Sequence, residues 1–342
     1  MPLPDAALAV WRRAYAAFQP VVTSLSGALP IATLDIVILA SLVWTAIAAW
    51  RWRRRRRAAV RASAPVDLVL RAATLVATGW LAFLGLWGWH YQVPTLEARL
   101  AVQPAELTAA RGEAFALTVV EALNLLHAEA HASGWADRQQ VAALVGPHVA
   151  RVLPTLGVAW TAGWPSPRQT MLDGYFQAAG VDGMTNPFGL EVLVNTHVLP
   201  MELPALAGHE FAHLAGFADE SDASVVAWLA CQTGGAGLRY SAALAVLPHV
   251  LTGLARPARQ ALLQTLDAGP RRDLQAISAR LAEQRPWVHA FAWQTYDGFL
   301  KANRVGEGVA RYDAVARVLV GVADPVTGRL RRSPSAWPSG HR

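Results

Sequence analysis

The sequence predicts a mainly helical protein of the α+β type: two membrane-spanning helices near its amino terminus, then a larger helical domain with a small β-sheet. Three observations lead to this prediction. Two apolar runs, residues 28–50 and 66–89, each have roughly the 20 residues that a helix needs to cross a bilayer core. After residue 90, apolar residues recur at helical spacing, with one short alternating stretch. With 54% hydrophobic residues, the 342-residue chain can also bury a sizeable core.

The positive charge of the chain is concentrated between the two apolar runs. Of the 30 basic residues, seven are arginines between Arg51 and Arg61, and the other 23 nearly balance the 24 acidic residues. This pattern lacks the extended positive surface that nucleic-acid binding requires, so we expect no nucleic-acid partner. A short arginine-rich loop between two spans stays in the cytoplasm, which places both termini outside it.

These features divide the chain into six segments. We expect an N-terminal extracytoplasmic segment (1–27), transmembrane helix 1 (28–50), an Arg-rich cytoplasmic loop (51–65), transmembrane helix 2 (66–89), an extracytoplasmic domain (90–324) and a disordered tail (325–342). The protein is then a multi-pass protein of the cell (inner) membrane, with the lipid bilayer as a partner.

Aromatic residues near the two apolar runs are interpreted as membrane contacts. Residues 5–18 can form an amphipathic helix on the membrane surface, with Trp11, Tyr15 and Phe18 as anchors. Trp87 and Tyr91 close the second run, where an aromatic belt is expected.

Two charged residues, Asp35 and Arg71, lie inside the apolar runs. A charge within a span is by default a candidate functional site. Each of these residues lies within about two turns of an end, so we expect the side chains to extend to the membrane interface instead.

The domain after residue 90 is expected to consist of helices and one short strand. Residues 190–195 alternate in the manner of a strand after an Asn-Pro-Phe-Gly turn. Such a strand could bind a peptide by strand addition, with Glu191 and Asn195 facing or bracing the site, although a plain structural hairpin fits the pattern equally well. Apolar periodicity predicts helices over residues 108–133, 203–215, 221–232, 241–254, 257–284 and 287–302.

The strongest indication of function is the pair His209 and His213. The two lie four residues apart, so on a helix they share one face, where two imidazoles can bind one zinc ion. Glu210 lies beside the open coordination position, where it can take a proton from a zinc-activated water and pass it to a leaving amine. Pro204 and Gly216 are suited to begin and end this helix. The segment predicts the zinc-binding helix of a metallopeptidase, which acts on a peptide or protein.

A catalytic zinc ion needs a third protein ligand, and the acidic candidates just downstream are Asp219, Glu220 and Asp222. Asp219 lies six residues after His213, and Glu220 begins a Glu-x-x-Ala segment that a second helix could bring to the metal. Either residue requires the chain to reverse at Gly216, because a continued helix would carry Glu220 about 10 Å along its axis. The spacing alone leaves both residues open.

Several segments together resemble an uncharacterised bacterial family of membrane-anchored, zincin-like proteins with two amino-terminal spans. The likeness is strongest from residue 183 to 231 and includes Asn186-Pro187-Phe188, Glu191, Asn195 and His209-Glu210-x-x-His213-x-x-Gly216-x-x-x-Glu220-x-x-Ala223. The resemblance implies a zincin-like fold, a zinc cofactor and Glu220 as the third ligand in a gluzincin-like arrangement. The chain departs from the family pattern at Asp222 and Ser224, where glutamate and asparagine are expected. The family has no known function, so it implies no substrate.

Four other residues have interpretations of their own. Tyr312 is a candidate donor to the developing oxyanion, a role that tyrosine has in many zincins. His127 and His131 also lie one helical turn apart and form a candidate second metal pair, without a glutamate in the catalytic position. Cys231 is the only cysteine, which excludes an internal disulfide and a Cys-rich metal site.

We therefore predict a membrane-anchored zinc endopeptidase in which His209, His213 and Glu220 hold zinc and Glu210 activates water. An intramembrane protease fits less well, because acidic residues and prolines break up the apolar sequence around the motif. The alternative from another class is a zincin-fold binding or sensor module with a structural or vestigial metal. Substrate specificity and oligomeric state are left open.

Overall fold

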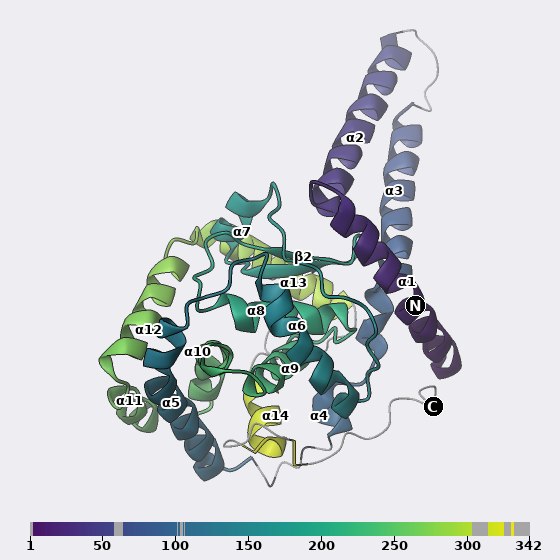
Figure 1. Ribbon diagram of the computed structural model, residues 1–342. Helices are drawn as coiled ribbons and strands as arrows, with labels where there is room; N and C mark the ends of the chain where they lie inside the picture. Colours follow the sequence, from purple (N-terminus) through teal and green to yellow (C-terminus); the bar gives the residue numbers. More distant parts are fainter. Residues whose placement is uncertain are drawn as a thin grey trace.

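A computed structural model describes residues 3–57, 64–100, 102, 105, 107–302, 314–324 and 330–331 of the chain. A long helical hairpin projects from a helical domain (Figure 1). The elements in chain order are α1 (Asp5–Ala28), α2 (Thr33–Arg57), α3 (Ala64–Leu86), η1 (Gly88–Gln92), α4 (Leu96–Arg99), α5 (Ala109–Ala132), α6 (Val141–Val152), η3 (Leu153–Leu156), α7 (Asp173–Ala179), β1 (Gly183–Asn186), β2 (Glu191–Val194), α8 (Leu203–Leu214), α9 (Glu220–Gln232), α10 (Ala236–Thr252), α11 (Arg256–Gln264), α12 (Ala268–Leu281), α13 (Pro286–Ala302) and α14 (Ala314–Val322).

Helices α2 and α3 form the projecting hairpin (Figure 1). Each contains a stretch that is long and apolar enough to cross a membrane, Thr33–Arg54 with mean hydropathy 1.8 and Val69–Leu86 with mean hydropathy 1.7. Few of their side chains are buried in the protein, as expected for helices that present apolar side chains to lipid. The chain thus has the two candidate membrane helices that the sequence predicts.

The bounds of these helices differ from the predicted segments. The first begins at Thr33 rather than at residue 28, because α1 continues to Ala28 and the turn that follows contains Pro30. The predicted loop 51–65 is helical at both ends, since α2 includes Arg51–Arg57 and α3 begins at Ala64. Residues 58–63 lie outside the described part of the chain.

Helix α1 is longer than the predicted segment 5–18, and one of its faces packs against the protein. Trp11 and Tyr15 are buried, and the Tyr15 hydroxyl donates to the Leu214 carbonyl oxygen at 2.8 Å. Trp87 is buried as well, and its indole N–H donates to the His213 carbonyl oxygen at 3.1 Å. The predicted membrane contacts of these aromatic residues are therefore wrong, because the rings cover the carboxyl end of α8 instead.

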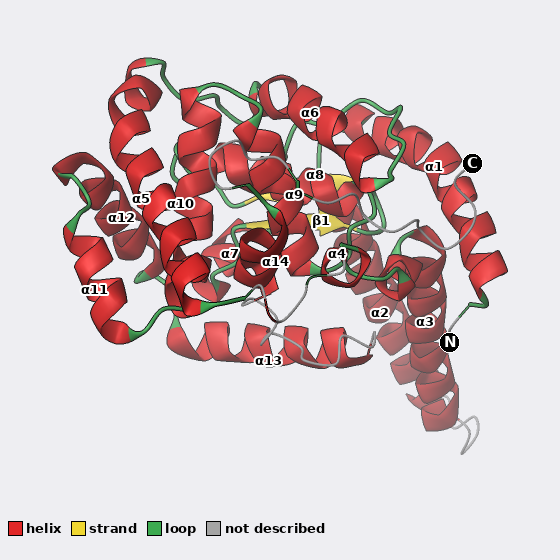
Figure 2. Ribbon diagram, turned by 90° about the horizontal axis from the view of Figure 1, so that it is seen from below, coloured by secondary structure: helices red, strands yellow, loops and turns green. Residues whose placement is uncertain are grey.

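The main hydrophobic core joins α8 and α9 to α5, α6, α10 and α14. Its fully buried side chains include Phe211, Leu123 and Leu247. Helices α6, α7 and α14 were not predicted, and in α6 the internal Pro147 interrupts the helical sequence pattern. α13 runs along the outside of the domain beside α7 (Figure 2).

The small sheet consists of β1 and β2, which pair antiparallel with Gly183 opposite Val194 and Asn186 opposite Glu191. β2 confirms the predicted strand. On its other side, β2 exchanges backbone hydrogen bonds with Arg168. β2 is therefore an interior strand that cannot accept a further strand, and β1 is the strand with an open edge among the described residues.

The predicted helix 257–284 is two helices, α11 and α12, with a break at residues 265–267. The break is held by Asn124 of α5, whose amide donates to the Thr265 carbonyl oxygen at 2.9 Å and whose oxygen accepts from the Asp267 N–H at 2.8 Å. A contact between residues more than 140 positions apart thus ends a helix that local periodicity continues.

The predicted tail 325–342 is described at two residues, and the remainder lies outside the described residues. Leu330 forms an isolated antiparallel bridge with Ala323, and the Arg331 N–H donates to the Val322 carbonyl oxygen at 2.7 Å. These two residues lie against the end of α14, and the prediction for the rest of the tail stays a prediction.

Buried carboxylates fix the first candidate span to the domain. Glu191 of β2 accepts from the Thr33 hydroxyl at 2.5 Å and from the Leu34 N–H at 3.1 Å, both at the start of α2. Asp35 is buried and accepts from Thr170 and Met171. The expected extension of Asp35 to the membrane interface is therefore wrong, because this carboxylate binds the loop before α7.

Replacing Glu191 with Ala should lower the free energy of unfolding by about 2–4 kcal/mol, because the Thr33 hydroxyl, the Leu34 N–H and the Asn186 amide lose a buried acceptor. Chemical denaturation of the full chain in detergent measures this change. Glu97→Ala is the control: it removes a more exposed carboxylate, paired with Arg317, and should cost less than about 1 kcal/mol. Equal losses in the two variants would contradict this role of Glu191.

Candidate metal centre

Helix α8 carries the His-Glu-x-x-His segment and ends where the sequence predicts. Pro204 lies in its first turn, and the helix stops at Leu214. Gly216 then has a φ of 98°, a conformation that favours glycine. A β-carbon at this position would lie 2.5 Å from the His90 ring. Glycine therefore allows the chain to reverse and start α9 beside α8.

The reversal brings three side chains together at one point, His209 and His213 from α8 and Glu220 from the first turn of α9. The Nε2 atoms of His209 and His213 lie 3.0 Å apart. Oε2 of Glu220 lies 3.1 Å from Nε2 of His209 and 3.5 Å from Nε2 of His213. Ligands of a tetrahedral zinc ion with bonds of about 2.0–2.1 Å are about 3.3 Å apart. The three donor atoms therefore fit one zinc ion.

Hydrogen bonds behind the imidazoles orient them toward this point. Nδ1 of His213 lies 2.7 Å from the Phe217 carbonyl oxygen, which can only accept, so Nδ1 carries the proton of the neutral ring. The lone pair of a neutral His213 is then on Nε2. Nδ1 of His209 lies 3.1 Å from the Ser224 hydroxyl. Such partners fix the tautomer and the orientation of metal-binding histidines.

The two acidic candidates have different positions in the structure. Asp219 is the N-cap of α9, where its carboxylate accepts from the Ser221 N–H at 3.0 Å and from the Ser221 hydroxyl. Glu220 lies against the histidines and also accepts from the hydroxyl of Tyr296 on α13. The geometry therefore groups Glu220, and not Asp219, with the two histidines. Tyr296 is a residue of the site that the sequence did not indicate.

The charges at this point are strongly coupled. Burial alone lowers the pKa of the His213 imidazole, but the Glu220 carboxylate outweighs it and raises the pKa to about 9. Burial alone raises the pKa of Glu220, but His213 and His209 together hold it well below its ordinary value. Without a metal, the His213 imidazole thus keeps a proton at the point where the three donor atoms converge. A metal cation would occupy the same point.

This pKa predicts how zinc binding depends on pH. Zinc binds the neutral imidazole, so below a pKa of about 9 the His213 proton must leave before the metal binds. The apparent zinc affinity of chelator-stripped protein should rise roughly tenfold per pH unit between pH 7 and 9 and level off above. Competition with a zinc-binding dye measures it. A constant affinity over this range would contradict the coupling of His213 to Glu220.

Glu210 lies beside β1. It is 3% exposed, and one of its carboxylate oxygens accepts from the Thr185 hydroxyl at 2.9 Å. A β-carbon on Gly183 would lie 2.7 Å from the other oxygen, so glycine lets the strand pass this close to the carboxylate. Burial raises the pKa of Glu210, and His213, His209 and the Thr185 bond offset part of that rise.

Other residues singled out from the sequence lie elsewhere. Glu191 and Asn195 brace the fold: Glu191 binds the start of α2, and the Asn195 amide donates to the Val181 carbonyl oxygen at 3.1 Å. Asp222 is buried and accepts from the Leu96 N–H. Tyr312 lies outside the described residues, and its role stays a prediction.

An ion-pair network, also absent from the sequence prediction, supports both α8 and β1. Arg280 of α12 binds Glu202, just before α8, at 2.6 Å and Asp182, just before β1, at 2.6 Å. The side chains of Arg280 and Glu202 are 9% and 15% exposed, whereas Asp182 is 35% exposed, so the Glu202 pair is the better shielded of the two. Together the pairs link the segment before the helix to the segment before the strand.

The chain matches one family model, that of a protein family of unknown function (DUF3810), over residues 11–320. The chain therefore belongs to this family, which confirms the membership that its motifs indicated. No curated protein and no solved structure matches the chain significantly.

Proposed function

From membership of a family without a known function, and from the geometry of α8 and α9, we propose that this protein is a membrane-anchored zinc metallopeptidase of the gluzincin-like type. The observation that carries the proposal is the convergence of His209, His213 and Glu220 within tetrahedral zinc distances, with Glu210 on the same helix. In this proposal the first three residues hold zinc and Glu210 is the general base.

Zinc, when bound, supplies a Lewis acid that brings the pKa of a water molecule near 7 and polarises the scissile carbonyl. Glu210 accepts the proton of the attacking water and returns it to the leaving amine, so no net proton is consumed in the hydrolysis. Burial raises the pKa of this carboxyl, which favours the proton-bearing form that the return step needs. Thr185 holds the carboxylate against β1, and Tyr296 orients Glu220.

The open edge of β1 suggests how a peptide substrate binds. In an antiparallel pair of strands, residues that hydrogen-bond to the partner strand alternate with residues that do not. Residues 182 and 195 share a backbone hydrogen bond, so the backbone N–H and C=O groups of Gly183 and Thr185 point away from β2. An extended peptide that adds to this edge lies next to Glu210, because both residues contact its carboxylate. This arrangement supports cleavage within an extended chain, as in an endopeptidase.

The localisation in this proposal follows from α2, α3 and the arginines between them. The two candidate spans suggest association with a membrane, and the positive loop favours the cytoplasm. The domain with the metal centre then lies on the extracytoplasmic side. A reporter enzyme fused after Asp324 tests this orientation: activity outside the cytoplasm supports it, and activity only in the cytoplasm contradicts it.

The proposed activity is tested with the full chain purified in detergent. We expect it to cleave unstructured peptides, to lose this activity when a chelator removes the metal, and to regain it with added zinc. Zinc binding without cleavage of any peptide in a broad library would instead identify a binding or sensor module that uses a zincin-like site.

A further inference from the structure

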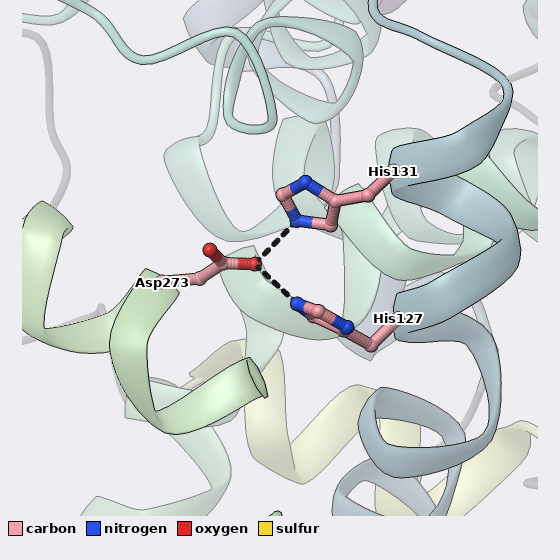
Figure 3. Close-up of side chains that lie close together, drawn as sticks. All are labelled: His127, His131 and Asp273. Atoms are coloured by element: carbon pink, nitrogen blue, oxygen red, sulfur yellow. Dashed lines mark hydrogen bonds and ion pairs between the residues drawn. The ribbon is translucent and has the colours of Figure 1, made fainter. Parts of the chain in front are cut away.

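A second group of potential metal ligands lies on α5 and α12, which in both overall views are on the side of the domain away from α2 and α3 (Figures 1 and 2). His127 and His131 project from neighbouring turns of α5, and both face one carboxylate oxygen of Asp273 on α12 (Figure 3). Nε2 of His131 lies 2.8 Å from this oxygen, and Nε2 of His127 lies 3.7 Å from it.

The local structure brings these residues together for reasons that are independent of α8. The break between α11 and α12 redirects the chain so that Asp273 meets α5. Gly269, in the first turn of α12, lies so close to the His127 ring that a β-carbon there would be 2.5 Å from it. Asp273 is itself buried, and the Tyr240 hydroxyl donates to the same oxygen at 2.6 Å.

The arrangement has the same parts as the first centre. Each has two histidines one helical turn apart, with ring centroids 4.4 Å apart here and 4.6 Å apart in the His209–His213 pair. Each has one carboxylate from a second helix, and in each that carboxylate accepts from a tyrosine hydroxyl. The difference is chemical, because Ala128 stands where the first centre has a glutamate, so this group lacks a general base.

We propose that His127, His131 and Asp273 form a second, structural metal site for a divalent ion of the zinc class. Two imidazole nitrogens and one carboxylate oxygen suit zinc and its neighbours, whereas calcium and magnesium prefer oxygen ligands throughout. All three donor atoms lie within 4.8 Å of one another, and the Nε2–oxygen distances of 2.8 Å for His131 and 3.7 Å for His127 lie on either side of the roughly 3.3 Å between two ligands of a tetrahedral zinc ion.

One further observation supports metal binding over a purely hydrogen-bonded pair. The His131 side chain is 36% exposed, which gives an ion an entry path and leaves room for water as the remaining ligand.

The second site would also support the first through α12. Asp273 lies two turns before Arg280 on the same helix, and Arg280 pairs with Glu202 before α8 and with Asp182 before β1. An ion that links Asp273 to α5 fixes the first half of α12. The second half of α12 carries Arg280, which positions α8 and β1 of the first centre.

The test is the zinc content of the full chain in detergent after dialysis against a weak chelator. We expect the wild-type protein to retain about one zinc ion per chain more than Asp273→Asn or His131→Ala, whatever the first centre holds. Asp273→Asn keeps an acceptor for the Tyr240 hydroxyl, so the fold has no need to change. Glu129→Gln, which removes an exposed carboxylate of α5 between the two histidines, should keep the wild-type content.

Equal zinc content in wild type and Asp273→Asn would overturn the second site, and it would leave the proposed peptidase centre untouched. A gain of signal provides an independent measurement. In Asp273→Cys loaded with cobalt, a thiolate ligand should give a charge-transfer absorption band that the wild-type protein lacks. A folded Asp273→Cys protein without this band would contradict the proposal as well.

Discussion

Glu210→Gln should retain zinc and lose about 10²–10⁴-fold in the rate of peptide cleavage. Glutamine has the size of glutamate and can still accept from the Thr185 hydroxyl, so the position of β1 beside α8 is kept. It cannot accept a proton from water, and the catalytic step therefore loses its base. Glu210 lies outside the group His209, His213 and Glu220, so zinc content should be unchanged.

The control for this prediction is Glu121→Gln, which removes an exposed carboxylate on α5 and should leave the rate unchanged. Both proteins are assayed on the same peptide, with zinc content measured on the same samples. If Glu210→Gln cleaves as fast as the wild-type protein with equal zinc, the proposed base is wrong.

The second large effect concerns the third ligand. Glu220→Gln removes the carboxylate that faces both imidazoles. The loss of a hydrogen-bond partner behind a metal ligand weakens metal binding by roughly 10–100-fold, and Glu220→Gln should weaken zinc binding by more than this. Asp219→Asn is the matched variant, one residue away. Asparagine is as good an N-cap as aspartate, so α9 should remain capped and zinc affinity should change little.

Titration of chelator-stripped proteins with zinc against a competing dye measures both affinities. The reverse result, with Asp219→Asn weak and Glu220→Gln unchanged, would move the third ligand to Asp219. Equal and small effects in both variants would remove α9 from the metal centre altogether.

Helix α8 was predictable because its signals are local. Pro204, the two histidines and Gly216 fixed its bounds to within a residue of α8. The choice between Asp219 and Glu220 was also within reach, since an aspartate directly before an apolar helix is a typical N-cap. A capping side chain is already committed to the backbone N–H groups of its own helix.

Contacts between distant segments were not predictable from local patterns. Asp273 contacts His131, which is 142 positions away in the sequence. The periodicity of residues 257–284 does not indicate the helix break that places Asp273 beside α5. Tyr296 lies on a correctly predicted helix, but its partner Glu220 is 76 residues away. β1 contains glycine and asparagine, which are poor strand formers, so its sequence carries no strand signal.

The aromatic residues at the base of the hairpin show a further limit of local patterns. Local patterns predict Trp11 and Trp87 at a lipid interface, yet both side chains pack on the protein. A ring with an apolar body and one donor suits both environments. The hydrogen-bond partner in the folded protein determines where each ring lies. The indole N–H of Trp11 donates to the Gly85 carbonyl oxygen at 2.7 Å, and the indole N–H of Trp87 donates to the His213 carbonyl oxygen.

Anomalous diffraction at the zinc absorption edge, from crystals of the zinc-loaded full chain, tests the central proposal most directly. We predict an anomalous peak bonded to Nε2 of His209, Nε2 of His213 and a carboxylate oxygen of Glu220, each at about 2.0–2.1 Å. Zinc-loaded crystals with no peak between these three side chains, or with Asp219 as the acidic ligand, would contradict it.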